Sequence, residues 1–330
     1  MFLLSRRQVL ETIAGTAAAA AIPRDARADN YPTRIIRLVI PYAAGGAGDQ
    51  IGRAWVDKMA SLLGPIYVEN IGGAGGALGC AAVAQSAPDG YSIVLGNGST
   101  QVMIPLTSAN PAYDPFRDFR AIYRLITSTL AFAVHPSLPV YDLQELVAYA
   151  KANPGKLSYG TPGVGTGNHL VGEMFKQRSG ALDIVHVPYR GITQATNDLV
   201  GGQIPLMIAV MSGQLLQLNQ AGKLRLLAVT SESRLRGAPG IPTVIESGMP
   251  DLNYAGWFGL FAPKATPDEI VDRIASATAI AMADPALQEN YRIQGMEPDT
   301  SSSPPRFQQL FEDEYARLAP VIKSIGLKRD

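Results

Sequence analysis

Two glycine-rich segments, each between a strand-like and a helix-like stretch, constrain this chain more than any other feature. Residues 42–49 follow a β-branched run at 36–40 and precede an amphipathic pattern that ends near residue 63. Residues 160–169 have the same setting, after a strand-like stretch at 157–159. A helix start offers unpaired N–H groups and partial positive charge, and glycine lets an anion approach them. One such loop is more often structural, but the pair predicts an anion site.

Strand-like and helix-like stretches alternate from the first loop to the C-terminal region, which predicts an α/β architecture. Further strands are expected at 66–68, 91–95, 123–134, 184–187, 204–210 and 224–230. Two helix starts have the spacing of a capping box, Asp142 with Glu145 and Thr266 with Glu269. Pro320 is expected to kink or stop the last helix.

A chain of 330 residues is long enough for two domains. Two strand-like stretches, 126–134 and 253–261, bracket the middle α/β set. If both cross between lobes, residues 29–127 and 254–330 form lobe 1, and residues 128–253 form an inserted lobe 2. The two glycine loops would then face each other across a cleft, and hinge closure around a ligand would be the natural use of that layout.

The first 28 residues have the pattern of an export signal. Arg6 and Arg7 form a twin-arginine start, residues 13–22 form a short apolar run, and Ala28 ends a small-x-small cleavage site. An uncleaved anchor is the competing interpretation, but the run is too short to span a bilayer. The sequence leaves twin-arginine and Sec export open. The mature protein is expected to be soluble and periplasmic, with cleavage near Ala28.

The composition argues against several classes of function. With 28 basic and 28 acidic residues, the net charge is zero, so no nucleic-acid partner is expected. The single cysteine, Cys80, cannot form an intrachain disulfide and is expected to be an inert packed residue. The three histidines lack the spacing of a zinc site, so no metal and no cofactor are expected. Thr166 with His169 is the sole candidate nucleophile–base pair, so no enzymatic activity and no catalytic residue are expected.

Two polar residues of the glycine loops have competing interpretations. For His169, a hydrogen bond that holds the loop or the helix start is favoured over a ligand contact. For Asp49, satisfying the helix start and orienting a water or polar ligand group are weighed equally.

A series of short motifs then follows in a fixed order along the chain: Tyr31-Pro32, Pro41-Tyr42-Ala43-Ala44-Gly45-Gly46 with Asp49, Val68-Glu69-Asn70 with Gly73-Ala74-Gly75-Gly76, Ala87-Pro88-Asp89-Gly90-Tyr91, Asn153-Pro154-Gly155-Lys156-Leu157, Tyr159-Gly160 with Gly163, Gly165, Thr166 and His169, His186-Val187-Pro188-Tyr189-Arg190-Gly191, Gly201-Gly202-Gln203, Ala221-Gly222-Lys223-Leu224-Arg225, Pro242-Thr243-Val244, and Gly256-Trp257-Phe258-Gly259-Leu260-Phe261-Ala262-Pro263. These motifs cover essentially the whole mature chain. In them the chain resembles the Bug/TctC family, the periplasmic solute receptors of tripartite tricarboxylate transporters.

This resemblance implies a two-lobed periplasmic binding protein fold of type II-like α/β class, each lobe a β-sheet flanked by helices, with the ligand cleft between the lobes. It implies that the two glycine loops, helped by ordered waters, hold a ligand carboxylate. N–H groups and helix fields can do this without an arginine. The far end of the ligand is expected near Asn97, Arg190 and Met211. The expected ligand-binding residues are Tyr42, Gly45, Gly46, Ala47, Asp49, Asn97, Thr161, Gly163, Gly165, Thr166, His169, Arg190, Met211 and Trp257.

Three positions depart from the family pattern, and all three lose a polar group. Gly48 stands where the family often has Thr or Ser, Val164 where it often has Asn, and Ala209 where it often has Asp. The departures indicate a less polar cleft, for which the candidate linings are Met207, Met211 and Trp257. The alternative is that these large residues belong to the core. If they line the cleft, a dicarboxylate with a longer aliphatic chain or an aromatic carboxylate is favoured over citrate or an amino acid.

The expected function is therefore capture of a small organic carboxylate by a monomer and its delivery to membrane transporter subunits. The alternative is a ligand-loaded sensor that docks on a two-component receptor kinase, and the sequence does not separate the two.

Overall fold

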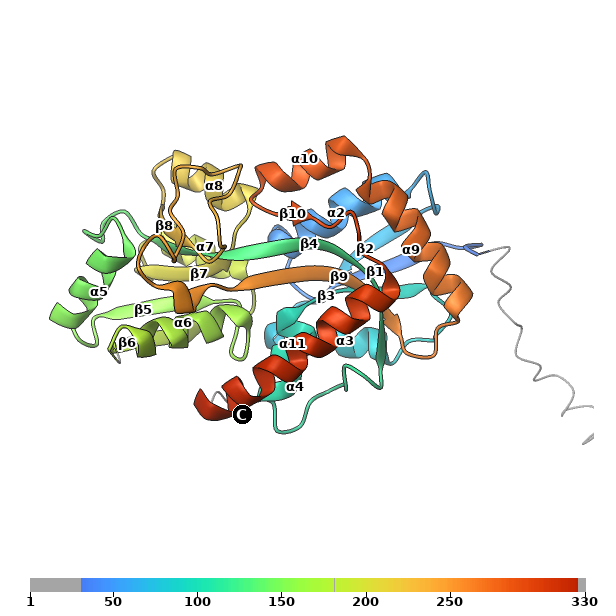
Figure 1. Ribbon diagram of the computed structural model, residues 1–330, viewed down its shortest axis with the longest axis horizontal. Helices are drawn as coiled ribbons and strands as arrows, with labels where there is room; N and C mark the ends of the chain where they lie inside the picture. The colour runs from blue at the N-terminus through green and yellow to red at the C-terminus, as the bar shows by residue number, and fades with distance from the viewer. Residues whose placement is uncertain (1–30, 181, 326–330) are drawn as a thin grey trace, which may run out of the picture.

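One long strand, β4 (Phe119–Val134), runs through both halves of the protein (Figure 1). In this computed structural model, which describes residues 31–180 and 182–325, the first part of β4 pairs with β9 (Ala255–Pro263). The last part, from Leu130 to Val134, pairs with β7 (Leu206–Val210) and β8 (Arg225–Val229). One strand therefore belongs to two sheets, each the centre of one lobe. The expected export signal at 1–28 lies outside the described residues.

Lobe 1 is built on the strand order β2-β1-β3-β9-β4, with β10 (Glu297–Pro298) also paired to β4. The bounds are Ile36–Ile40 for β1, Ile66–Asn70 for β2 and Ser92–Asn97 for β3. One face of this sheet is covered by α2 (Ala47–Met59), α9 (Asp268–Met282) and α10 (Pro285–Ile293). The other face is covered by α3 (Ala77–Ala84), the short helices η4 (Ser99–Met103) and α4 (Ile104–Thr107), and α11 (Pro304–Ile325). A single turn, η3 (Ala74–Gly76), precedes α3.

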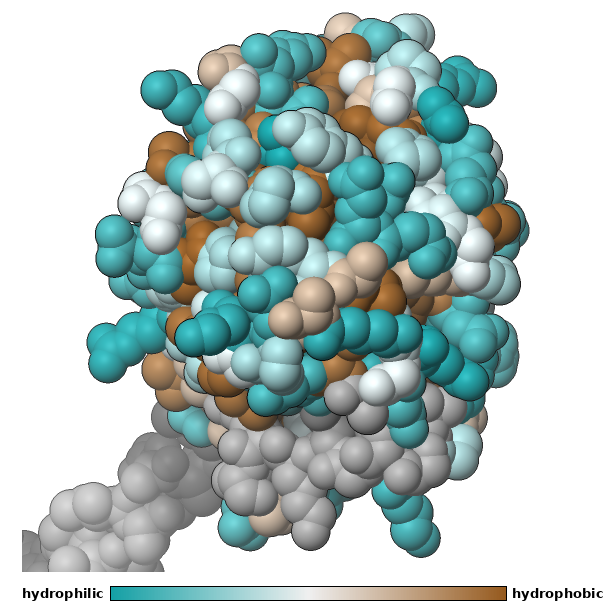
Figure 2. Space-filling model, turned by 90° about the vertical axis from the view of Figure 1, so that its left-hand side faces the viewer, coloured by the Kyte–Doolittle hydropathy of each residue, from teal (hydrophilic) through white to brown (hydrophobic). Residues whose placement is uncertain are grey.

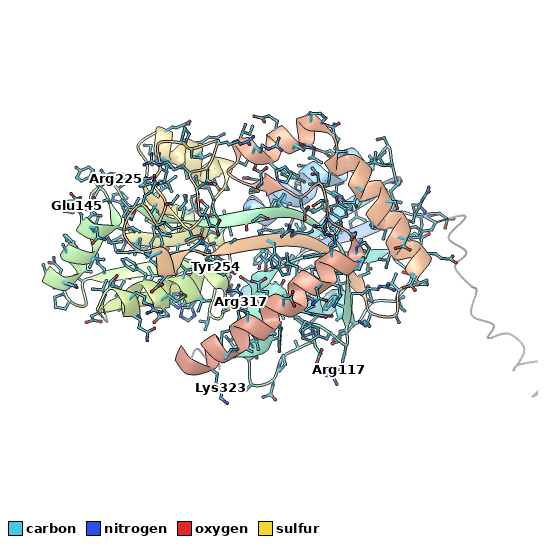
Figure 3. All side chains as sticks on the ribbon, viewed as in Figure 1. Arg117, Glu145, Arg225, Tyr254, Arg317 and Lys323 are labelled. Atoms are coloured by element: carbon cyan, nitrogen blue, oxygen red, sulfur yellow. The ribbon has the colours of Figure 1, made fainter. Side chains whose placement is uncertain are left out.

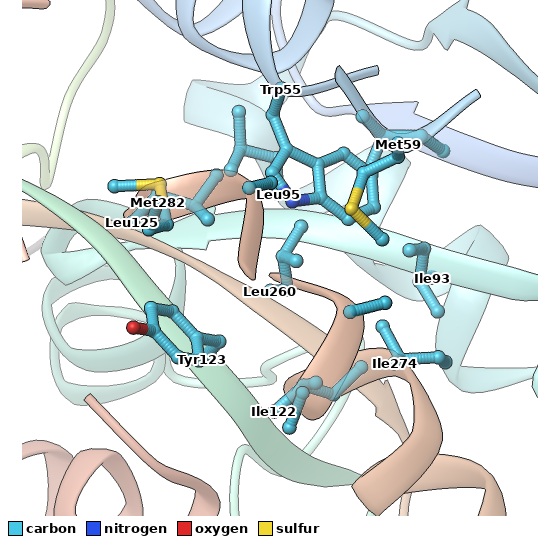
Figure 4. Close-up of a cluster of buried hydrophobic side chains, with 14 of the residues drawn as sticks. Trp55, Met59, Ile93, Leu95, Ile122, Tyr123, Leu125, Leu260, Ile274 and Met282 are labelled. Carbon is cyan, nitrogen blue, oxygen red and sulfur yellow. The ribbon is translucent and has the colours of Figure 1, made fainter. Parts of the chain in front are cut away.

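Helix α2 shows how the sequence builds this core. Ile51, Trp55 and Met59 recur every four residues, so they share one helix face. All three are fully buried, and Figure 4 shows Trp55 and Met59 packed against Ile93 and Ile274 of the sheet and of α9. The glycine loop before α2 is thereby attached to a rigid element.

Lobe 2 repeats the plan with the strand order β6-β5-β7-β4, and β8 pairs with the other edge of β4. Strand β5 is Leu157–Thr161 and β6 is Ile184–Pro188. Helices α5 (Leu143–Ala152) and α6 (Gly167–Arg178) cover one face. Helices α7 (Ile192–Val200) and α8 (Gly213–Gln220) cover the other, and the turn η5 (Pro250–Leu252) precedes the return to lobe 1.

The lobes meet where β4 and the start of β9 cross between the sheets. Strand β4 changes partners between Thr129 and Leu130. The hydroxyl of Thr230 accepts a hydrogen bond from Leu130 N–H at 2.9 Å and donates to the carbonyl of Tyr254 at 2.7 Å. Tyr254 is labelled at this crossing in Figure 3. The division into two lobes at 127/128 and 253/254 stays a prediction. The change of strand partners and the contacts of Thr230 lie close to both boundaries and support it.

Helix caps and stops follow the sequence patterns unevenly. At α5, Asp142 accepts from Glu145 N–H as expected, although Glu145 reaches Tyr141 N–H, one residue before the cap. The prediction that Thr266 caps α9 is wrong, because the helix begins after Pro267 and the buried Thr266 hydroxyl has no partner among the described residues. Helix α11 does not stop at Pro320, since buried side chains on both sides of the proline keep it packed.

The surface of lobe 2 is mixed in polarity. Figure 2 views this end of the molecule, and its hydrophobic side chains are scattered among polar ones. No helix within residues 31–180 and 182–325 has the length and apolarity needed to cross a membrane.

Candidate functional site

A cavity with about 450 Å³ of unfilled space, its open mouth included, lies between the lobes. About 40 Å³ of this space is free for the centre of a water molecule, so the cavity is narrow in this arrangement of the lobes. The described residues that line it are all uncharged: Tyr42, Ala43, Gly46, Ala47, Gly48, Asn97, Ser99, Pro162, Asn168, Ile192, Val210 and Phe258. A few polar groups in an otherwise apolar wall can orient a ligand that has one polar end.

Three helix starts converge on this cavity. Ala47 begins α2, Asn168 lies in the first turn of α6, and Ile192 begins α7. The residues before α2 and α7 are Gly46 and Gly191, which have no side chain to cap the first N–H groups. Unpaired N–H groups and the positive helix ends favour an anion, each helix field by about 0.3–1 kcal/mol.

Asp49 holds the first glycine loop from within α2. Its carboxylate accepts hydrogen bonds from Gly45 N–H, the Arg53 guanidinium and the Asn70 amide, each at 3.0 Å. Burial alone would raise the pKa of Asp49, but these donors outweigh it and keep the pKa below its ordinary value. These bonds hold the loop before α2, whose N-terminus has no side-chain cap, so satisfying the helix start stays a prediction. A ligand contact by Asp49 stays a prediction, and the residue is not part of the cavity wall.

His169 has the corresponding place in the second glycine loop. Its Nδ1 accepts from Gly165 N–H at 3.2 Å, and its backbone N–H is capped by the Thr166 hydroxyl at 3.3 Å. The ring stacks on His186 with centroids 4.0 Å apart and planes inclined by 13°. Nε2 of His186 lies 2.7 Å from the Thr161 hydroxyl. The favoured interpretation, a histidine that holds the loop, describes these contacts.

Both stacked imidazoles prefer the neutral form. Burial lowers the pKa of His169, with Glu173 opposing the shift and Lys176 adding to it. Burial and the charges of His169 and Lys176 lower the pKa of His186 to about 3. The hydroxyl of Tyr159, also beside this pair, donates to Glu173 at 2.7 Å.

A pH dependence of stability follows from these shifts. Because an unfolded histidine titrates near pH 6.5, the unfolded state binds more protons than the folded state as the pH falls below that value. The contribution of these two histidines to folding stability is therefore fully present above pH 6.5, and it is lost as the pH falls toward 3. The loss is at most about 1.4 kcal/mol per pH unit for His186, less because its ring is partly exposed.

Chemical denaturation of wild type and His186→Gln at pH 7.5 and 4.5 measures this. We expect the variant to be less stable at pH 7.5, where it loses the stack, and the gap to narrow or invert at pH 4.5. A gap independent of pH would show that His186 is not held neutral.

The two lobes touch around the cavity. Gly167 N–H donates to the Ser99 hydroxyl across the cleft at 3.0 Å, and the Thr193 hydroxyl donates to the Ala44 carbonyl at 3.2 Å. A Cβ added to Gly46 would lie 3.2 Å from Cγ2 of Ile192. The structure is thus a closed arrangement of the lobes.

Asn97 and Tyr42 form one polar corner of the cavity. The Tyr42 hydroxyl donates to Asn97 Oδ1 at 3.0 Å, and Thr100 N–H donates to the same oxygen at 3.0 Å. Burial raises the pKa of Tyr42, so the phenol keeps its proton. With Oδ1 engaged twice, the amide NH₂ is the group of Asn97 that can serve a ligand.

The predicted site residues divide into three groups. Tyr42, Gly46, Ala47 and Asn97 line the cavity. A second group holds the two loops from behind, by the hydrogen bonds described above and by left-handed glycine conformations: Gly45, Asp49, Thr161, Gly163, Gly165, Thr166 and His169. The third group, Arg190, Met211 and Trp257, lies elsewhere.

The third group departs from the expected cavity wall for identifiable reasons. Arg190 is exposed to solvent ahead of α7. Met211 is fully buried and packs on Gly295, while its neighbour Val210 faces the cavity. Trp257 points away from the cleft and its indole N–H donates to Glu314 of α11. Met207 is also a core residue. The placement of these large side chains therefore follows the alternative stated above, that they belong to the core and do not line the cleft.

Sequence reasoning missed several wall residues, notably Ser99, Ile192 and Phe258. Ile192 follows Gly191, and this third strand-to-helix turn was visible in the sequence. Phe258 is the β-sheet neighbour of Asn97, and alternate residues of a strand face opposite sides. Choosing Phe258 over Trp257 required knowing which face of β9 is the cleft.

The described residues contain no group of three or more His, Cys, Asp or Glu side chains placed to bind a metal ion. Cys80 is buried, and burial raises the pKa of its thiol to about 12.

Comparisons with known proteins agree with this geometry. The family model described as "TctC: Tripartite tricarboxylate transporter family receptor" matches residues 51–327. The structure of the periplasmic binding protein BugD is similar, with 33% identity, a TM-score of 0.86 and coverage of 91% of this chain and 100% of BugD. Rpa4515 of R. palustris with adipate has 31% identity, a TM-score of 0.86 and coverage of 90% and 99%. MatC of Rhodopseudomonas palustris with bound malate has 28% identity, a TM-score of 0.83 and coverage of 88% and 100%. The two-lobed α/β fold expected from the sequence is thereby confirmed.

Proposed function

Because this chain belongs to the tripartite tricarboxylate transporter receptors, a family of periplasmic solute-binding proteins, we propose that it captures a small organic carboxylate between its lobes and delivers it to the membrane subunits of such a transporter. Action as a monomer is part of the proposal. Adipate and malate, the ligands of two similar proteins, are both carboxylates.

The observation that carries the proposal is the convergence of three helix starts on an uncharged cavity. A ligand carboxylate at that point would accept from backbone N–H groups of α2, α6 and α7, and charge-assisted bonds of this kind are about twice as strong as neutral ones. A cation would meet the positive ends of the helices and would be repelled.

The cavity wall supports a ligand with a hydrocarbon body. Beyond the polar corner, the wall is formed by Ala43, Pro162, Ile192, Val210 and Phe258. A hydroxyl or amino group on the ligand would lose its water there without gaining a partner, at a cost of about 1–3 kcal/mol. We propose an aliphatic dicarboxylate or an aromatic carboxylate, in preference to citrate or an amino acid.

Thermal unfolding of ligand-stripped protein tests this. Adipate and benzoate are expected to raise the melting temperature by several degrees, because ligand at about 100 times its dissociation constant adds roughly 2.7 kcal/mol of stability. Malate and citrate are expected to shift it less, and the matched neutral compounds adipamide and benzamide should not shift it.

Calorimetric titration of the best carboxylate gives its affinity directly. Equal shifts from the acids and their amides would contradict an anion site. No shift from any carboxylate of the panel would contradict the proposed ligand class.

A further inference from the structure

Ser99 connects the cavity to the joint between the lobes. It begins η4 in lobe 1, it is 8% exposed, and it lines the cavity. Its Oγ accepts the hydrogen bond from Gly167 N–H, the first residue of α6 in lobe 2. One hydroxyl therefore touches both the ligand space and the opposite lobe.

The backbone before η4 is rigidly held. Asn97 N–H donates to the Thr100 hydroxyl at 3.0 Å, and Thr100 N–H donates back to Asn97 Oδ1 at 3.0 Å. The Thr100 carbonyl also accepts from the hydroxyl of Tyr113. These reciprocal bonds fix the direction in which Ser99 leaves the chain.

The partner of Ser99 belongs to the closed arrangement. As the first residue of α6, Gly167 has an N–H without an acceptor in its own helix. A Cβ on Gly167 would lie 2.5 Å from Oη of Tyr254, so only glycine lets the start of α6 pack this closely against Tyr254. Moving the lobes apart would separate Ser99 from Gly167.

The Ser99 hydroxyl has a second function available. A hydroxyl that accepts one hydrogen bond still has its own proton to donate, and an ionised carboxylate can only accept. We propose, given the carboxylate-binding function above, that Ser99 couples ligand to closure: its O–H donates to a carboxylate oxygen while its Oγ accepts from Gly167 N–H.

Polarisation of the hydroxyl makes the two hydrogen bonds of Ser99 cooperative. When a hydroxyl donates to an anion, its oxygen becomes a better acceptor, so each bond strengthens the other. Ligand would thereby strengthen a contact between the lobes that it does not itself touch.

Thr193 supplies a matched contact without the second function. Its hydroxyl donates to the Ala44 carbonyl across the cleft at 3.2 Å, and the residue is partly buried and lies outside the cavity wall. Removing this bond should lower the closed-to-open ratio of the free and of the ligand-loaded protein by the same factor. Removing the Ser99 hydroxyl should lower that ratio more in the loaded protein than in the free protein.

Single-molecule fluorescence transfer between dyes on α9 of lobe 1 and α5 of lobe 2 gives the closed-to-open ratio with and without adipate or benzoate. The coupling is the factor by which ligand raises that ratio. For Ser99→Ala we expect the coupling to fall on the order of 10-fold and the affinity to fall on the order of 10- to 100-fold. For Thr193→Val the coupling should equal that of wild type.

Equal coupling in wild type, Ser99→Ala and Thr193→Val would overturn the role of Ser99 while leaving the proposed function intact. Absence of carboxylate binding by the wild-type protein would instead overturn the proposed function. If Ser99→Ala does not fold, Ser99→Cys replaces it, because a thiol keeps the shape but is a weak donor. The same loss of coupling is expected.

Discussion

Replacing Gly46 with valine should weaken carboxylate binding on the order of 10- to 100-fold, with little change in the melting temperature of the free protein. The backbone of Gly46 has φ −80° and ψ 176°, which any residue can adopt. Its added Cβ, however, would lie 3.2 Å from Cγ2 of Ile192 in the other lobe. Overpacking of this kind costs about 1–3 kcal/mol, and only the closed form bears that cost.

The double variant Gly46→Val with Ile192→Ala provides the control. Truncating Ile192 makes room for the valine, so the double variant should bind more tightly than Gly46→Val alone. Calorimetric titration of the four proteins in the cycle gives the interaction energy. Strictly additive losses would mean that the two residues do not meet on closure.

Replacing Asp49 with alanine should destabilise the protein by about 2–3 kcal/mol and weaken ligand binding by at least about 10-fold. The substitution leaves Gly45 N–H, Arg53 and Asn70 without their shared acceptor, and bonds to a charged group each contribute about 1.5–3 kcal/mol. Arg53 is half exposed and can turn to water, which limits the loss. Binding suffers because the loop next to the first turn of α2 is no longer fixed.

Asp57→Ala is the matched control, since Asp57 is an exposed carboxylate of the same helix. Denaturant unfolding and calorimetry on both variants separate the two effects. Wild-type affinity in Asp49→Ala, despite lower stability, would mean that the loop needs no help from Asp49 to bind ligand. Equal stability of the two variants would contradict the hydrogen-bond account.

The elements around the cleft were predictable because their signals are local. Strand, glycine loop and helix follow one another within about twenty residues, and the chemistry of a helix start does not depend on the rest of the fold. The roles of Asp49 and His169 could only be weighed as alternatives, since Asn70 and His186, which lie beside them, come from other strands.

The wall of the cavity was harder to predict, because it depends on which face of each strand looks into the cleft. Trp257 and Phe258 are adjacent aromatic residues of β9, and nothing in their spacing tells which one meets Asn97. The same holds for Val210 and Met211 at the end of β7. Helix η4 escaped prediction because its polar residues read as a loop, and Ser99 was missed with it.

The strand arrangement also sets an order of assembly. All five strands of the lobe 2 sheet lie between residues 119 and 229, so that sheet has its full set of strands once this part of the chain has emerged. In lobe 1, β9 lies between β3 and β4 but begins only at Ala255, after the whole of lobe 2. Until β9 arrives, the inner edges of β3 and of the first part of β4 have unpaired backbone groups, which are open to association with other chains. Lobe 1 is therefore the part of a nascent chain that most needs protection before folding is complete.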